Sequence, residues 1–66
     1  MNVRQLKVGD TFLDRGQPAV VLSAIANKWD RTVLVTYRYA HNGRIRQARF
    51  PDTENVVMAY DEEADG

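Results

Sequence analysis

The residues best suited to chemistry gather in one stretch, TYRYAHNGRIRQAR, at positions 36–49. It holds four arginines, two tyrosines, one histidine and no acidic residue. Guanidinium groups present fixed pairs of N–H donors that suit phosphate oxygens, and neighbouring aromatic rings can stack on unpaired bases. We therefore expect a binding surface here. With the loop that precedes this stretch, the candidate residues for binding nucleic acid or a protein partner are Lys28, Trp29, Arg38, Tyr39, Arg44, Arg46 and Arg49.

The groups needed for catalysis or metal binding are scarce. Hydrolysis and group transfer need converging groups, such as a nucleophile with a base or two carboxylates. The single histidine, His41, lies at an expected turn, the chain has no cysteine, and no pair of His, Asp or Glu has metal-ligand spacing. We predict a protein that is not an enzyme and that uses no cofactor, no metal and no small-molecule substrate.

Trp29 stands in the loop sequence NKWDR, at positions 27–31. In one interpretation its indole folds back and caps one end of a small core. In the other it is an exposed anchor for a partner, since tryptophan is enriched at the energetic hot spots of interfaces. The sequence leaves both open.

The length and charge of the chain indicate one small domain with a short tail. Sixty-six residues lie near the lower size limit for unaided folding. We assign residues 1–60 to the domain and the last six, DEEADG, to a disordered acidic tail. All nine basic residues lie within 1–60 beside five acidic ones, so this part carries +4 although the total charge is zero. One hypothesis is that the tail folds over the basic surface and masks it.

The composition also bears on location. No apolar run approaches the roughly 18 residues of a membrane span, and the absence of cysteine fits a reducing compartment. We expect a cytoplasmic protein with no membrane partner.

Strands and turns must position the candidate residues. Runs rich in β-branched and aromatic residues, bounded by Gly, Pro, Asn and Asp, are typical of strands. After a lead-in at 4–10 that contains one helical turn or a short strand, we predict strands at 10–14, 19–26, 32–40, 44–50 and 55–60. The tight turns between them predict an antiparallel all-β sheet curled into a five-stranded SH3-like small barrel.

Asn42-Gly43 predicts a two-residue type I′ turn, which needs positive φ at both central residues. This turn places His41 opposite Arg44, and it pairs Val35 with Phe50, Tyr37 with Ala48 and Tyr39 with Arg46. Arg46 is then placed to stack over the Tyr39 ring. Because side chains alternate between faces, the inner face holds Val33, Val35, Tyr37, Ala48 and Phe50. The outer face holds Thr36, Arg38, Gln47 and Arg49, with Ala40 and Ile45 near the turn.

Three segments, RGQPAVVLSAIANK (15–28), NGRIRQARF (42–50) and ENVV (54–57), carry a family resemblance. Over about residues 7–58 the chain resembles the N-terminal domain of bacterial elongation factor P and its eukaryotic counterpart, an SH3-like barrel of the KOW type. The resemblance places Lys28 where the family has its modified lysine. However, glycines flank the family's lysine and none flanks Lys28, and the oligonucleotide-binding-fold domains of the family have no counterpart in these 66 residues. The resemblance therefore implies the fold and not the family's action on the ribosome.

Three functions remain open at this point. The leading one is a non-enzymatic module that engages nucleic acid through the arginines, aided by Trp29 or Tyr39. The alternative is a protein-interaction module, or a small regulator or inhibitor of a larger complex, that uses Trp29 with the Ala40/Ile45 tip or adds a strand at an open edge. The third is a structural subunit that associates with itself.

Overall fold

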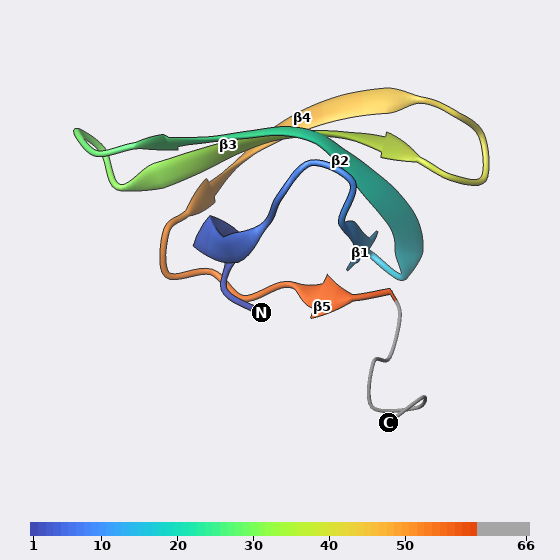
Figure 1. Cartoon of the computed structure of the whole chain (residues 1–66), viewed down its shortest axis with the longest axis horizontal. Coiled ribbons are helices and arrows are strands. Elements are labelled where there is room, and N and C mark those ends of the chain that lie inside the picture. The colour runs from blue at the N-terminus through green and yellow to red at the C-terminus, as the bar shows by residue number, and fades with distance from the viewer. Residues whose placement is uncertain (60–66) are drawn as a thin grey trace.

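The computed structural model describes residues 1–59, which form one five-stranded antiparallel sheet with strand order β4-β3-β2-β1-β5 (Figure 1). A 3-10 turn, η1 (Val3–Gln5), precedes the sheet. The strands are β1 (Thr11–Asp14), β2 (Gln17–Asn27), β3 (Thr32–Tyr39), β4 (Ile45–Pro51) and β5 (Val57–Met58). The predicted all-β class and the five antiparallel strands are confirmed. The predicted acidic tail, 61–66, lies outside the described residues.

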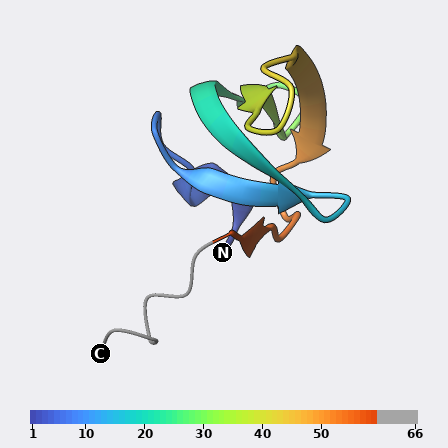
Figure 2. The same cartoon turned by 90° about the vertical axis from the view of Figure 1, so that its right-hand side faces the viewer.

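The sheet is not closed into a barrel, so that part of the prediction is wrong. Figure 2 shows β2 curving from the β3–β4 layer towards β1. β5 pairs with β1 through two residues only. The segment before β5 forms backbone hydrogen bonds with the N-terminus. The Val3 N–H donates to the Glu54 carbonyl (2.9 Å), and the Val56 N–H donates to the Met1 carbonyl (2.7 Å). This pairing occupies the chain that would have to reach β4 to close the barrel.

A β-bulge at Leu22 changes which side chains of β2 face the core. Val21 pairs with Tyr37, whereas Ser23 pairs with Thr36, so Leu22 is the extra residue. A bulge bends its strand and strengthens the twist, which suits the curvature of β2. It also reverses the alternation, and Ala24 therefore packs against the core whereas Ile25 points outward.

The core lies between the two layers of this bent sheet. Along β3, every second side chain is buried in this core, as the sequence predicts for a strand with one buried face. Ala48 and Phe50 on β4 pack against it from the same side. The predicted inner face is thus confirmed. The core consists of Val3, Leu6, Phe12, Ala19, Val21, Val33, Val35, Tyr37, Tyr39 and Val56.

The turn between β3 and β4 differs from the prediction. Tyr39 pairs with Arg44, because the Tyr39 N–H donates to the Arg44 carbonyl (2.8 Å), and four residues, 40–43, form the loop. Gly43 has φ of 72°, but Asn42 does not have positive φ, so a type I′ turn does not form. The Asn42 side chain instead accepts a hydrogen bond from the Arg44 N–H (2.9 Å), which favours the wider loop.

The wider loop moves the β3–β4 register by two residues. Val33 lies opposite Phe50, Val35 opposite Ala48 and Tyr37 opposite Arg46. The individual pairs predicted from the two-residue turn are therefore wrong. Since side chains repeat every two residues along a strand, a shift of two leaves every residue on its predicted face.

Candidate binding face

Four rows of side chains cross β2, β3 and β4 on the side away from the core, and we call this the outer face. Within each row the residues pair directly across the strands. The rows are Val20–Arg38–Ile45, Ser23–Thr36–Gln47, Ile25–Leu34–Arg49 and Asn27–Thr32–Pro51. The second row is polar and is joined by a hydrogen bond from Gln47 Nε2 to Thr36 Oγ1 (3.0 Å).

Apolar side chains interrupt this polar and cationic face at two places. Ile25 is 60% exposed in the third row, and Ile45 is 63% exposed in the first row. Leu22, the bulged residue, is also exposed, and Leu34 is half-buried beside Ile25. Ile25 and Leu34 pair directly across β2 and β3, and contiguous exposed apolar surface is a mark of candidate interaction sites. The outer face is therefore a candidate binding face.

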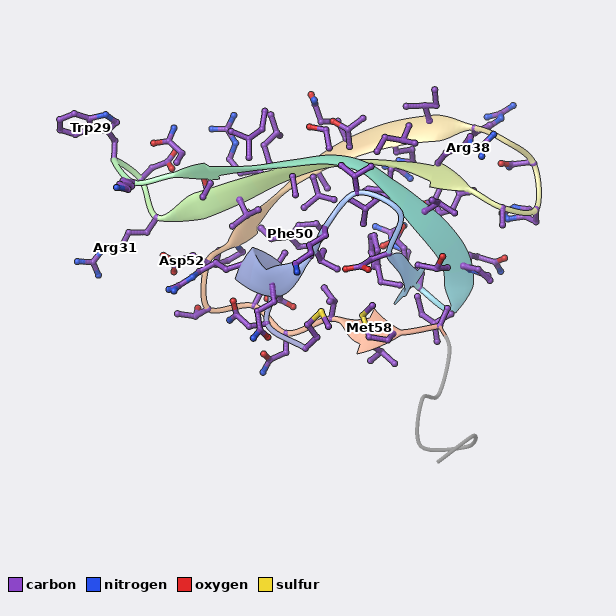
Figure 3. All side chains as sticks on the ribbon, viewed as in Figure 1. Trp29, Arg31, Arg38, Phe50, Asp52 and Met58 are labelled. Atoms are coloured by element: carbon purple, nitrogen blue, oxygen red, sulfur yellow. The ribbon has the colours of Figure 1, made fainter. Side chains whose placement is uncertain are left out.

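Trp29 lies at the tip of the β2–β3 hairpin and is 97% exposed. The interpretation in which it caps the core is wrong. The turn is held by other groups: the Asn27 side chain accepts from the Trp29 N–H (2.9 Å), and Thr32 Oγ1 donates to Asp30 (2.6 Å). Lys28, in the same turn, is exposed. The backbone of the turn is thus satisfied locally, and the indole is left in solvent (Figure 3).

The four arginines of the predicted site are all exposed, but they lie on two sides of the sheet. Arg38 and Arg49 belong to the outer face, whereas Arg46 lies on the inner side opposite Tyr37 and Arg44 opposite Tyr39. Arg46 is therefore not opposite Tyr39 as predicted. Figure 3 shows Trp29 and Arg38 at opposite ends of the molecule, so the structure does not bring the predicted residues into one cluster.

Among residues 1–59, Asp30 is the one acidic residue that forms an ion pair, with Arg49, at 3.4 Å between Oδ2 and Nη1. Both side chains are about half exposed, so solvent screens the pair and it adds little to stability. It does hold the Arg49 side chain towards the Trp29 turn. The third row of the outer face and the hairpin tip are therefore adjacent.

Tyr39, another predicted binding residue, lies in the core. Its hydroxyl donates to Asp14 on β1, and the Tyr37 hydroxyl donates to the same carboxylate oxygen at 3.4 Å. Burial, the charge of Asp14 and the neighbouring Tyr39 raise the pKa of Tyr37 to about 12. Both phenols thus link β3 to β1 inside the domain. The Tyr39 ring also touches His41, with 5.6 Å between ring centroids.

Sequence reasoning did not find the exposed apolar residues of β2. The run AVVLSAIA is apolar at almost every position, so its periodicity cannot tell an inner residue from an outer one. The bulge at Leu22 then decides the matter in the three-dimensional structure. Asp14 was missed for a different reason, since nothing local connects β1 to the tyrosines of β3.

Residues 1–59 contain no group of three His, Asp or Glu side chains placed to hold a metal ion. In the same part of the chain there is no helix with the length and apolar character to cross a membrane. No protein-family model, no curated protein and no solved structure matches the chain. The resemblance to the N-terminal domain of elongation factor P therefore remains a prediction.

Proposed function

We propose that this protein is a non-enzymatic binding module that holds another protein on its outer face and on Trp29. The observation that carries this proposal is the 97% exposure of Trp29 at a hairpin tip whose backbone is satisfied by other residues. Folding gains nothing from this indole in the free molecule. A partner that covers it gains about 4–6 kcal/mol of gross burial energy, from 150–250 Å² at about 25 cal/mol per Å².

The residue types on the outer face support a protein partner. Tryptophan and arginine are enriched at the centres of protein interfaces. Here Arg38 and Arg49 accompany Ile25 and Ile45 on one side of a three-stranded layer, and Trp29 stands at the tip of the β2–β3 hairpin. Arg38 and Arg49 on that face favour a partner that combines apolar and acidic side chains. Nothing in this arrangement needs a substrate or a cofactor.

The test is capture of a partner by the immobilised full chain from host lysate treated with nuclease, followed by binding of the purified partner. Trp29→Ala should weaken that binding at least about 30-fold, as expected for a hot-spot residue that contributes about 2 kcal/mol. Val8→Ala is the matched control, because Val8 is an exposed apolar residue away from the outer face. Equal binding by both variants would contradict the proposal.

Nucleic acid remains a second candidate partner, and a specific observation favours it. All five arginines between positions 31 and 50 are exposed, and Asp30 alone among residues 1–59 forms an ion pair with one of them. However, Tyr39 is buried and Trp29 lies far from Arg38, which leaves the basic hairpin without an exposed stacking ring except His41.

An oligonucleotide titration separates the two candidates. Binding through phosphates weakens steeply with added salt, because each neutralised phosphate releases a counterion. A steep salt dependence that disappears in Arg38→Gln and Arg44→Gln would support nucleic acid. The absence of binding to single-stranded or double-stranded DNA and RNA at low salt would exclude it.

For the fold, we infer an open variant of the SH3-like small barrel, related at this level to the N-terminal domain of elongation factor P. The support is the sequence likeness together with a five-stranded antiparallel sheet in which β1 to β4 form a meander and the last strand, β5, pairs with the first. Lys28 lies in the loop between the two longest strands, β2 and β3. Backbone hydrogen bonds between β4 and β5, detected in solution, would show a closed barrel and contradict this inference.

A further inference from the structure

We propose that the free edge of β4 binds an extended acidic segment of the partner protein as a sixth strand. This inference rests on the proposed function, because it takes the partner to be a protein, and it names how that partner docks. Strand addition supplies affinity through main-chain hydrogen bonds and specificity through side chains on both faces of the added strand.

The first argument is the position and length of β4. It is the end strand of the sheet and pairs with β3 alone. β4 spans seven residues, whereas β5 at the opposite end of the sheet spans two. Figure 1 shows β4 along the margin of the upper layer.

The second argument is the direction of its backbone groups. The Tyr39 N–H donates to the Arg44 carbonyl, and in an antiparallel ladder the residues that bond to the neighbouring strand alternate with residues that do not. The N–H and C=O groups of Ile45, Gln47 and Arg49 therefore point away from β3. Within residues 1–59 these three residues form no backbone hydrogen bonds outside the ladder.

The third argument is where the usable edge ends. Pro51 occupies the next position in the same alternation and has no N–H to offer. Proline on an edge strand is also a known device against unwanted strand pairing. The edge that can accept a strand is therefore confined to residues 45–49, which corresponds to a short linear segment of the partner.

The fourth argument is charge. Arg46 projects on the inner side of β4 and Arg49 on the outer side, with Arg44 one position before the strand. Among residues 1–59, Asp30 alone forms an ion pair with any of the three. An added strand places its side chains beside arginines on both faces, so acidic residues on both of its faces are favoured. Opposite charges directly across neighbouring strands stabilise the pairing of the two strands.

The same charges disfavour a second copy of this chain as the occupant. Pairing β4 with another β4 would bring four arginines onto two adjacent strands, with an Arg44 directly before each, in a region with no acidic residue between positions 31 and 51. Like charges on neighbouring strands are destabilising. The arginines thus protect the edge against self-association while they attract an acidic strand.

The added strand would also extend the outer face. Its outward side chains lie next to Ile45, Gln47 and Arg49, whose backbone groups it bonds. An apolar residue beside Ile45 would cover a side chain that is 63% exposed in the free molecule. The edge and the outer face therefore form one continuous docking surface.

The experiment uses the full chain and two synthetic ten-residue peptides. The acidic probe combines Glu, Val and Thr with Glu at odd and even positions, and the comparison peptide has Gln in place of every Glu. We expect the acidic peptide to bind at least about tenfold more tightly at low salt, and the difference to shrink as salt screens the charges. Equal binding of the two peptides would overturn the proposal.

Amide hydrogen exchange locates the bound peptide. Saturating acidic peptide should slow exchange of the Ile45, Gln47 and Arg49 amides, which form no hydrogen bond with any other residue among 1–59. The amides of Arg46 and Ala48 should change little, because they already bond to β3. Protection elsewhere, with none at these three amides, would refute strand addition.

Two variants at one position separate the backbone from the side chain. Gln47→Pro removes an N–H that the β3 ladder does not use and should weaken peptide binding about tenfold, the effect of a lost hydrogen bond of about 1.4 kcal/mol. Gln47→Ala loses only the contact with Thr36 and should bind within about twofold of the unmodified chain. The proposal would be contradicted if both variants bound the peptide equally weakly, or if both bound it as tightly as the unmodified chain.

The outcomes also separate this inference from the proposed function. Loss of partner binding by Trp29→Ala, with no amide protection at β4, would refute the edge site and leave the proposed function standing. Amide protection at β4 with partner binding unaffected by Trp29→Ala would support the edge site and refute the role of Trp29.

Discussion

Tyr37, a buried tyrosine of β3, makes the stability of this domain fall at alkaline pH. Tyr37 is buried in the core, and its hydroxyl donates a hydrogen bond to a carboxylate oxygen of Asp14. The Tyr39 hydroxyl donates to the same oxygen. Burial is the largest cause of the rise in the pKa of Tyr37 from 10.0 to about 12, followed by the charge of Asp14 and the interaction with the neighbouring Tyr39. The perturbation is therefore a rise in pH, compared between the unmodified chain and Tyr37→Phe.

The sign follows from the direction of the shift. The folded state favours the neutral phenol, so this contribution of Tyr37 is fully present below pH 10, the ordinary pKa. It is lost as the pH rises from 10 towards the folded-state pKa of about 12. A difference of two pKa units corresponds to at most roughly 3 kcal/mol. A domain of this size has a total stability of about 5 kcal/mol, so the effect is large.

Urea unfolding followed by circular dichroism at pH 7, 9, 10, 11 and 12 measures the effect. Trp29 is a poor reporter of unfolding, because it is already 97% exposed in the folded chain. At pH 7, Tyr37→Phe should be less stable by about 1 kcal/mol, because it loses a hydrogen bond to a carboxylate. Between pH 10 and 12 this gap should close and then invert, as the unmodified chain loses roughly 2–3 kcal/mol that the variant does not lose.

An absorbance titration of the phenols serves as the control. The chain contains three tyrosines, and removal of Tyr37 should eliminate the component that titrates near pH 12. A stability gap that stays constant from pH 9 to pH 12 would refute the reasoning. The same conclusion would follow if every phenol titrated near the ordinary value of about 10.

Three further predictions concern the turn, the N-terminus and the bulge. Gly43→Ala should lower the free energy of unfolding by about 1 kcal/mol, because Gly43 has a φ of 72°. The space around Gly43 is open, so the cost comes from the backbone conformation and not from a clash. Gly43→Asn should lower the free energy of unfolding by less, and equal decreases for the two variants would contradict this. Asn2→Ala should cost about 1 kcal/mol, since its side chain accepts from the Arg4 N–H (2.8 Å) and donates to the Asp52 carbonyl (3.1 Å); a melting temperature unchanged from the parent would refute this. Because the extra backbone residue at Leu22 produces the bend in β2, deletion of Leu22 should lower the urea midpoint far more than Leu22→Thr. Leu22→Thr should change stability by less than about 0.5 kcal/mol, and similar midpoints for the two variants would show that the bulge does not cause the bend.

The alternation of β3 is the part of the fold that its own sequence specifies best. In TVLVTYRY every second residue is apolar or aromatic on one side, and this periodicity is intrinsic to an extended backbone. The inner face of β3 and β4 followed from it correctly. It survived a wrong turn assignment, because the register error was an even number of residues.

The turn itself shows where local reasoning fails. Asn-Gly is the strongest short signal for a type I′ turn, but the same asparagine can accept a hydrogen bond from the N–H two residues later. In this chain Asn42 bonds to the Arg44 N–H, and the loop is two residues wider than predicted. Both the type I′ turn and the observed wider loop use local interactions of the same Asn-Gly pair, so the local sequence pattern is compatible with either.

Local residue patterns were sufficient to predict the all-β class, the five strands, the inner face of the β3–β4 hairpin and a cationic segment without acidic residues. These depend on local composition and on the period of two along a strand. The three-dimensional contacts were needed to show that Ile25 points to solvent, that Tyr39 binds Asp14 in the core, that Trp29 is exposed and that the sheet stays open. Each of these depends on contacts between distant segments, namely the register of β2 against β3, of β1 against β2, and of the N-terminus against residues 54–56. A local pattern carries no information about such pairings, because any of several registers satisfies the same periodicity.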